Sequence, residues 1–277
     1  MLNSGSLAGK RPNPAGDELP KDGLYLYAVA RLTVDIPPGM TGINGEPVIV
    51  IPFGDMAAIL HACPPKPYAD NDERVTTEWV LAHQRTLERL LDAGIPVIPF
   101  SFDTIIKPRG DQKSAEVLTG WLAEEHEKFE TIFDRIRNKK EYGIQVFCDI
   151  AKIRDAVRQS DEKVRTLFHE IQVSGPGKEY LLRQKLEKQL KIAADEKTGG
   201  IVTGVMEKIR CFCDDVQFAK LKKGSDPDLT MILNCSCLVS DKNYQELGEA
   251  LEELRDRMDL TVRFTGPWPA YSFVGNR

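Results

Sequence analysis

The C-terminal stretch Leu260-Thr-Val-Arg-Phe-Thr-Gly-Pro-Trp-Pro-Ala-Tyr-Ser-Phe-Val274 is the part around which the rest of the chain is organised. Its first half alternates apolar and polar residues, which predicts a β-strand with one buried face. Gly266 and Pro267 are expected to stop this strand, and the prolines stiffen the backbone that follows. Chain ends are usually polar and loose. Because this one is aromatic and rigid, we expect it to be fixed within the fold or against a partner.

Three aromatic side chains in this tail, Trp268, Tyr271 and Phe273, are candidates for partner binding. Rigid aromatic groups often contribute most of the binding energy at protein–protein interfaces. The alternative is that these side chains lock the tail onto its own domain. The sequence leaves both interpretations open.

The order of elements before the tail predicts the fold of the C-terminal half. The expected elements are a strand at 142–148, helices at 151–159 and 178–210, strands at 216–221 and 229–239, a helix at 244–258 and the strand from residue 260. This order is that of a ferredoxin-like split βαβ fold, an antiparallel sheet with helices on one face. Gly199-Gly200 and Gly204 weaken the long helix, which favours a kink or break there. We therefore assign residues 142–277 to a ferredoxin-like domain that includes the structured aromatic tail.

The N-terminal half has the pattern of a second, smaller domain with mixed helices and strands. Its expected elements are strands at 24–30, 48–51 and 95–100, helices at 55–62 and 72–93, and a long helix at 115–140. We expect a disordered arm at residues 1–22, an α+β domain at 23–110 and a bridging helix at 111–141. The fold class is thus α+β, with two domains and long helices.

Composition limits the function classes that fit. The chain has 277 residues, 42% of them hydrophobic, and a net charge of −5 without a strongly basic block, which argues against nucleic acid as a partner. No apolar run approaches the roughly 20 residues of a membrane helix. The N-terminus lacks the apolar core of a signal peptide. We expect a cytoplasmic protein with no membrane partner.

Four of the six cysteines form two Cys-x-Cys pairs, Cys211 with Cys213 and Cys235 with Cys237. Metal sites more often use Cys-x2-Cys, and free cysteines are among the most buried residues. We expect buried thiols. A metal- or redox-binding protein that uses these four residues is the alternative function.

No spacing of a nucleophile, base or metal ligand indicates a reaction. His83 is expected to be a hydrogen-bonded histidine at the boundary of the core, since no cysteine, aspartate or serine stands at a telling distance. The stretch Gly175-Pro-Gly-Lys178 lacks the spacing of a phosphate-binding loop. We therefore predict a non-enzymatic protein without a cofactor. A small-ligand regulatory module remains possible by analogy of fold alone.

Five stretches of the chain carry a family resemblance: Leu24-Tyr-Leu-Tyr-Ala-Val29, the segment from His83 through Ile95-Pro-Val-Ile-Pro-Phe100, Gly177-Lys-Glu-Tyr-Leu181, Leu233-Asn-Cys-Ser-Cys-Leu-Val239 and Phe264-Thr-Gly-Pro-Trp-Pro-Ala-Tyr-Ser-Phe-Val274. Together they resemble the gas vesicle GvpL/GvpF family over nearly the whole chain beyond the arm. The last is the most specific, because its composition is unusual. Family members usually have a glycine where Phe102-Asp103-Thr104 stands, and alanine or an aromatic residue where Cys235 and Cys237 stand.

The resemblance implies an accessory gas vesicle protein in the cytoplasm and at the gas vesicle. Its implied partners are the small, hydrophobic major shell protein and other accessory gas vesicle proteins. Its implied role is to help nucleate or assemble the shell while limiting aggregation. The resemblance also implies a two-domain fold whose second domain is a modified ferredoxin-like one, in agreement with the order of elements.

Overall fold

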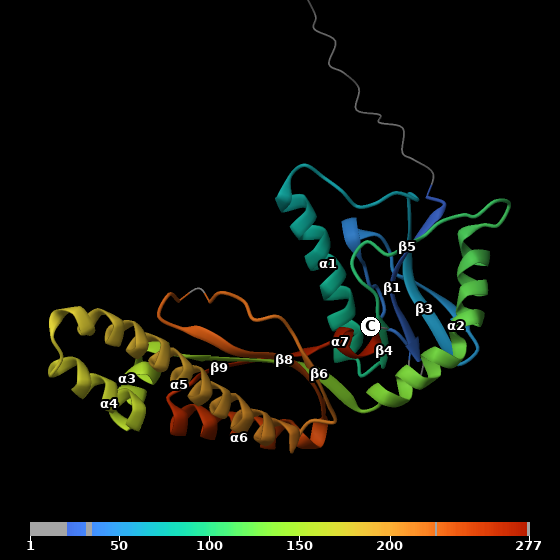
Figure 1. The fold of residues 1–277 in the computed structure, drawn as a ribbon. Coiled ribbons are helices and arrows are strands. Elements are labelled where there is room, and N and C mark those ends of the chain that lie inside the picture. The colour runs from blue at the N-terminus through green and yellow to red at the C-terminus, as the bar shows by residue number, and fades with distance from the viewer. Residues whose placement is uncertain (1–20, 32–34, 225, 276–277) are drawn as a thin grey trace, which may run out of the picture.

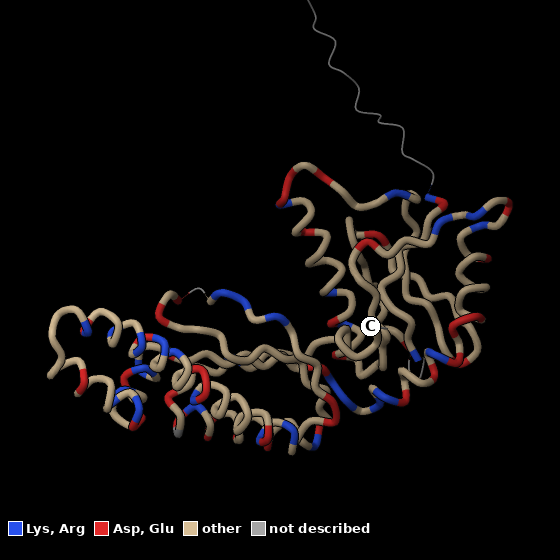
Figure 2. The backbone as a smooth tube through the Cα atoms, viewed as in Figure 1, with Lys and Arg blue, Asp and Glu red and all other residues tan. Residues whose placement is uncertain are grey.

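The computed structural model describes residues 21–31, 35–224 and 226–275, with Arg257 described by its backbone alone. The expected disordered arm at 1–22 lies, apart from its last two residues, outside the described residues. Two antiparallel sheets with their own helices lie side by side (Figure 1). Basic and acidic residues are interspersed over both parts (Figure 2). Among the helices in these ranges, none combines the length and the apolar character that crossing a bilayer requires.

The first sheet is built around β1, which is apolar on both faces and buried along most of its length. The sheet has the order β2-β3-β1-β4, and β5 also pairs with β1. The strands are β1 Gly23–Arg31, β2 Ile49–Phe53, β3 Met56–Cys63, β4 Val97–Pro99 and β5 Ile105–Ile106. The expected strands at 24–30, 48–51 and 95–100 are confirmed, with β4 shorter than expected.

The helix expected at residues 55–62 is wrong, because this segment is strand β3. Its alanines and leucine favour a helix when considered alone. However, Gly54 adopts φ +60 in the tight turn after β2, so the chain reverses and β3 pairs with β2 on one side and β1 on the other. Backbone hydrogen bonding to a strand on each side therefore outweighs the helix propensity of this segment.

Two helices cover opposite faces of the first sheet. Helix α1, Glu73–Asp92, begins at Asp72, whose side chain accepts a hydrogen bond from the backbone N–H of Arg74, and is followed by Gly94 at φ +72. The predicted helix at 72–93 is therefore confirmed, and each end differs from the prediction by one residue. Helix α2, Ser114–Ile136, stops four residues before the predicted end, because Asn138 turns at φ +55 into the next strand. Tyr25 and Tyr27 of β1 pack on the α1 side, and Leu26 and Val29 pack on the α2 side.

The second sheet has the order β7-β8-β6-β9, with every neighbouring pair antiparallel. Its strands are β6 Lys139–Cys148, β7 Asp215–Phe218, β8 Thr230–Ser240 and β9 Thr261–Trp268. The predicted hairpin of β7 and β8 and the predicted strand at 142–148 are confirmed. The strand β9 continues to Trp268, whereas we expected Gly266 and Pro267 to end it.

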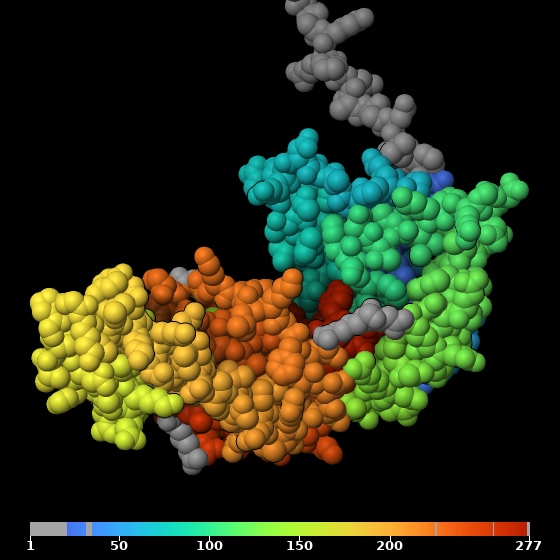
Figure 3. All heavy atoms as spheres, viewed as in Figure 1, coloured from blue at the N-terminus to red at the C-terminus, as the bar shows by residue number. Residues whose placement is uncertain are grey.

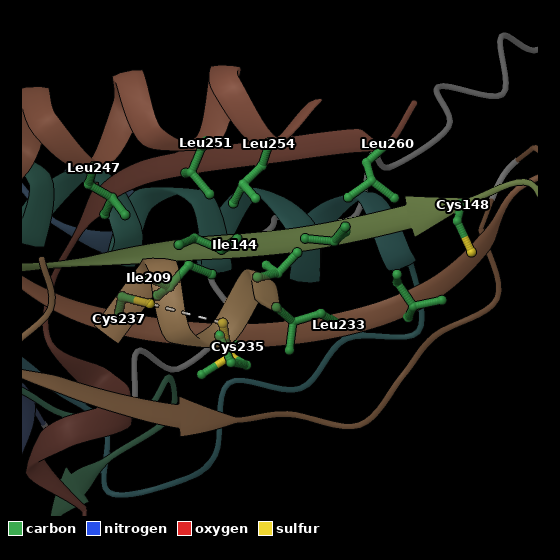
Figure 4. Packing of buried hydrophobic residues seen from close by; sticks show 14 of the residues in the cluster. Ile144, Cys148, Ile209, Leu233, Cys235, Cys237, Leu247, Leu251, Leu254 and Leu260 are labelled. Atoms are coloured by element: carbon green, nitrogen blue, oxygen red, sulfur yellow. Dashed lines mark hydrogen bonds between the residues drawn. The ribbon is translucent and has the colours of Figure 1, made fainter. Parts of the chain in front are cut away.

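The longer helices of the second half are α3 Ile150–Ser160, α4 Glu162–Gln172, α5 Pro176–Arg210 and α6 Tyr244–Met258. Helices α5 and α6, with Ile153 of α3, pack on one face of this sheet, whereas α4 packs against α3 and α5. The bounds of α6 are those predicted, whereas α4 was not predicted as a separate helix. Helix α5 runs through Gly199 and Gly200 without the break considered above. Leucines of α6 point at β6 and close the core (Figure 4).

Candidate functional site

The C-terminal tail leaves the second sheet and crosses to the first. Gly266 adopts φ +125, and a Cβ there would lie 2.9 Å from the Glu141 carbonyl oxygen, so only glycine fits without a shift. The peptide bond between Gly266 and Pro267 is cis. The tail ends in the short helix α7, Tyr271–Val274, which contacts β4 and α2. Figure 3 shows the dark red tail between the two parts of the molecule.

Phe273 anchors the tail in the core between the first sheet and α2. Its side chain is 1% exposed and packs in the same cluster as Leu26 of β1 and Leu238 of β8. The Arg135 guanidinium of α2 lies 5.6 Å from the centre of the Phe273 ring. The same guanidinium donates a hydrogen bond of 2.9 Å to the Phe273 carbonyl oxygen and forms an ion pair with Asp215 of β7. Arg135 therefore joins α2, the tail and the second sheet.

Ser272 fixes the tail to the second sheet through a buried carboxylate. The backbone N–H of Ser272 donates to one oxygen of Glu141 over 2.8 Å, and its hydroxyl donates to the other oxygen over 2.6 Å. Glu141 is only 6% exposed. A buried carboxylate is costly unless it is hydrogen-bonded, so these two bonds make the docked tail the favourable state for Glu141.

Tyr271 fixes the tail to the first sheet. Its hydroxyl lies 3.0 Å from Nε2 of His83, a buried residue of α1. Nδ1 of the same ring lies 2.9 Å from the Tyr25 hydroxyl. Burial raises the pKa of Tyr271 well above the usual value of a phenol. The expectation that His83 is a hydrogen-bonded histidine at the core boundary is confirmed.

A second, similar chain of hydrogen bonds runs beside this one. Nδ1 of His61 lies 2.9 Å from the Tyr27 hydroxyl, and its Nε2 lies 2.9 Å from the Tyr68 hydroxyl. The rings of Tyr25 and His61 stack with their centres 5.0 Å apart, which joins the two chains. Sequence analysis missed this network, because its members come from separate elements and share no local spacing.

Both histidines are held in the neutral form. Burial lowers the pKa of His61 and of His83 to about 4. The backbone N–H groups of Ile43 and Asp103 donate to the Tyr27 and Tyr25 hydroxyls, respectively. Because each of these two hydroxyls already accepts a backbone N–H, it can donate its own proton to Nδ1 of the neighbouring histidine. The Nε2–H of that histidine then donates to the tyrosine on its other side, Tyr271 for His83 and Tyr68 for His61. The network thus stabilises the first sheet and the tail rather than presenting a reactive group to solvent.

Trp268 is the accessible member of the three tail aromatics. Its side chain is 38% exposed, and its indole N–H donates a 3.4 Å hydrogen bond to the Thr265 hydroxyl. It lines a cleft of about 160 Å³ between the two sheets, together with Pro269 of the tail and with Leu91 and Pro96 of the first half. The structure therefore brings the three predicted site residues into one tail but gives them different surroundings.

The four paired cysteines lie at the end of α5 and along β8. Cys235 and Cys237 are buried with their sulfurs 4.0 Å apart, Cys213 is half-buried and Cys211 is exposed. Hydrogen bonding to Cys213 and Cys235, together with burial, raises the pKa of Cys237, whereas the hydrogen bond to Cys237 lowers the pKa of Cys235. The expectation of buried thiols is therefore confirmed for Cys235 and Cys237 and is wrong for Cys211, which directly follows the end of α5.

One group in the described part of the chain has the spacing of metal ligands, and it contains no cysteine. Its members are Asp55, His126 and Glu130. The Arg31 guanidinium forms ion pairs with both carboxylates, Asp55 at 3.8 Å and Glu130 more closely. The Arg31 guanidinium therefore already offsets the negative charge of the two carboxylates, which would otherwise attract a metal ion.

Comparison with known proteins gives one consistent result. A family model described as gas vesicle synthesis protein GvpL/GvpF matches residues 23–275. The chain is 25% identical over 282 residues to gas vesicle protein L1 of Halobacterium salinarum, an alignment that covers 97% of this chain and 98% of that protein. It is 26% identical to gas vesicle protein L of Haloferax mediterranei, over 84% of this chain and 72% of that protein.

Solved structures share the fold. The crystal structure of gas vesicle protein GvpF from Anabaena sp. PCC7120 superimposes with a TM-score of 0.72 at 17% identity, over 92% of this chain and 99% of that one. GvpF from Microcystis aeruginosa gives a TM-score of 0.67 at 16% identity, over 92% of this chain and 100% of that one. At these identities the likeness is one of fold.

Proposed function

The chain belongs to the GvpL/GvpF family of gas vesicle synthesis proteins, and on this basis we propose that it is an accessory, non-enzymatic gas vesicle protein. The observation that carries the proposal is the family match over residues 23–275. It binds the hydrophobic major shell protein and other accessory gas vesicle proteins, and so helps to nucleate or assemble the shell. A shell subunit exposes apolar surface before it is incorporated, and a partner that covers this surface limits aggregation.

The tail is our candidate for the surface that meets the partner. Trp268 supplies an exposed aromatic group between Pro267 and Pro269, whose rings restrict the backbone on both sides of it. A preformed aromatic contact loses little conformational entropy on binding. Tyr271 and Phe273 contribute by fixing this geometry, since both are held against the first sheet. The cleft beside Trp268 is large enough for one apolar side chain of the partner.

We also keep the division of the chain as a proposal, with an α+β domain at 23–110, a bridging helix at 111–141 and a modified ferredoxin-like domain at 142–277. The strand order β7-β8-β6-β9 and the helices on one face support the ferredoxin-like assignment. The aromatic tail belongs to the last domain by sequence and packs largely on the first. It therefore acts as a connection between the two.

Co-expression with the major shell protein, followed by pull-down and sedimentation, tests the function. We expect the wild-type chain to capture the shell protein and to keep it in the supernatant, and Trp268→Ala to weaken the capture. Tyr180→Ala is a matched control, because Tyr180 is 65% exposed and belongs to α5 rather than to the tail. If the wild-type chain captures no shell protein, the proposal is wrong in its choice of partner.

A further inference from the structure

Strand β9 forms an open edge of the second sheet. It spans eight residues, Thr261–Trp268, and β6 is its neighbour in the sheet. The opposite edge strand, β7, spans only four residues and begins at Asp215, which forms an ion pair with Arg135. Proteins usually shorten or cover sheet edges, because unpaired backbone groups there attract other strands. The longer edge is thus the one available for pairing.

A groove of about 490 Å³ runs beside this edge, between β9 and α6. Leu251 of α6 and Val262 and Phe264 of β9 contribute its apolar surface, and Figure 4 shows Leu251 pointing from α6 towards the sheet. Phe264 is held in place by stacking on Tyr244, with ring centres 5.8 Å apart. If a partner strand paired with β9, every second side chain of that strand would lie on the same face of the sheet as Val262 and Phe264. These side chains would therefore lie over the groove.

The rim of the groove is acidic. Glu249 and Glu252 of α6 line it, both are exposed, and neither forms an ion pair with any residue whose side chain the structure describes. Arg255, which also lines the groove, is already paired with Asp256 at 3.0 Å. Lysine or arginine side chains in the partner would complement this rim. A second copy of the chain paired through β9 would instead bring like charges together.

We propose that β9 and the groove beside α6 form a strand-addition site. An extended apolar segment that carries a lysine or arginine pairs with the free edge of β9, inserts alternate side chains into the groove and places its basic group near Glu249 and Glu252. Backbone pairing supplies affinity in this mode of recognition, and the pockets for alternate side chains supply specificity. This inference rests on the proposed function, from which we take the occupant to be an extended segment of the hydrophobic major shell protein.

The first test reverses the charge of the rim. The variant Glu249→Lys/Glu252→Lys is compared with Glu246→Lys/Glu196→Lys, which makes the same change in net charge at exposed positions of α6 and α5 outside the groove. We expect the rim variant to capture the co-expressed shell protein roughly five- to tenfold less well, while the control captures it like the wild type. Circular dichroism and the denaturant midpoint check that both variants fold.

The second test measures backbone amide hydrogen exchange of the full chain with and without the shell protein. We expect slower exchange in Thr261–Phe264 when the shell protein is present and unchanged exchange in β7.

The outcomes separate this inference from the proposed function. Suppose that the wild type and both variants capture the shell protein equally well and that β9 is not protected from exchange. Strand addition is then wrong, and the proposed function stands. If the wild type captures nothing, the choice of shell protein is wrong for both. Protection of β9 that depends only on the concentration of this chain assigns the edge to a second copy and overturns the proposal.

Discussion

The hydroxyl of Tyr271 lies 3.0 Å from Nε2 of His83, a contact between residues 188 positions apart in the sequence. His83 belongs to α1 on the first sheet, whereas Tyr271 follows the last strand of the second. The next tail residue, Ser272, is bound by Glu141 of β6. Two consecutive residues thus hold one tail against both halves of the molecule.

Removing only the Tyr271 hydroxyl isolates one of these contacts. In Tyr271→Phe the ring is kept, but the N–H of His83 loses its acceptor in a buried site. We expect the free energy of unfolding to fall by about 1–3 kcal/mol, the usual cost of an unsatisfied buried donor. Urea denaturation measures this, with the exposed Tyr180→Phe as the control. An unchanged unfolding free energy would show that water replaces the hydroxyl without cost.

Stability should depend on pH through the two buried histidines. Burial lowers the pKa of His61 and His83 from 6.5 to about 4 in the folded state. Between these values the unfolded chain binds more protons than the folded one, so stability is complete above about pH 6.5 and falls as the pH decreases towards 4. Full protonation of each histidine should lower the free energy of unfolding by roughly 3 kcal/mol, because a pKa shift of one unit corresponds to about 1.4 kcal/mol.

Denaturant midpoints measured from pH 7.5 to pH 4 test this prediction. His83→Gln removes one of the two titrating groups and should flatten the pH dependence of the unfolding free energy by about half. His169→Gln is the control, since His169 is exposed on α4. If His83→Gln has the same slope as the wild type, the acid sensitivity arises from other groups.

The sequence predicts those features that depend on neighbouring residues. The cap at Asp72 and the turn at Gly94 bound α1, and the helical spacing of the leucines predicts α6. The alternation that starts at Leu260 predicts strand β9, and the order of elements predicts an antiparallel sheet. The signals for the single helices and strands lie within each element, where periodicity and capping act.

Features that depend on distant residues were missed. Strand β3 reads as a helix because nothing within residues 55–62 reveals that β1 and β2 flank it. The partners of His83 come from β1 and from the tail, so no spacing along the chain reveals them. For the same reason the sequence could name Trp268, Tyr271 and Phe273 as a group but could not separate the exposed ring from the buried one.

The cysteines give a further prediction. In the native protein Cys211 should react rapidly with a thiol reagent and the half-buried Cys213 more slowly, while the four buried thiols should react only after unfolding. Purified protein should carry less than a stoichiometric amount of zinc or iron. Fast reaction of Cys235 or Cys237 in the native state, or one bound metal per chain, would favour the metal or redox function instead.

The exposed and buried aromatics of the tail should separate binding from stability. Phe273→Ala removes a ring that is 1% exposed and should lower the unfolding free energy by about 3–5 kcal/mol, because it leaves a cavity in the core beside α2. Trp268→Ala removes a ring that is 38% exposed and should change stability much less. In pull-downs with the major shell protein, however, Trp268→Ala should capture less shell protein than the wild type while it remains folded. If Trp268→Ala instead keeps full capture, the tail serves only to join the two sheets, and the partner binds elsewhere.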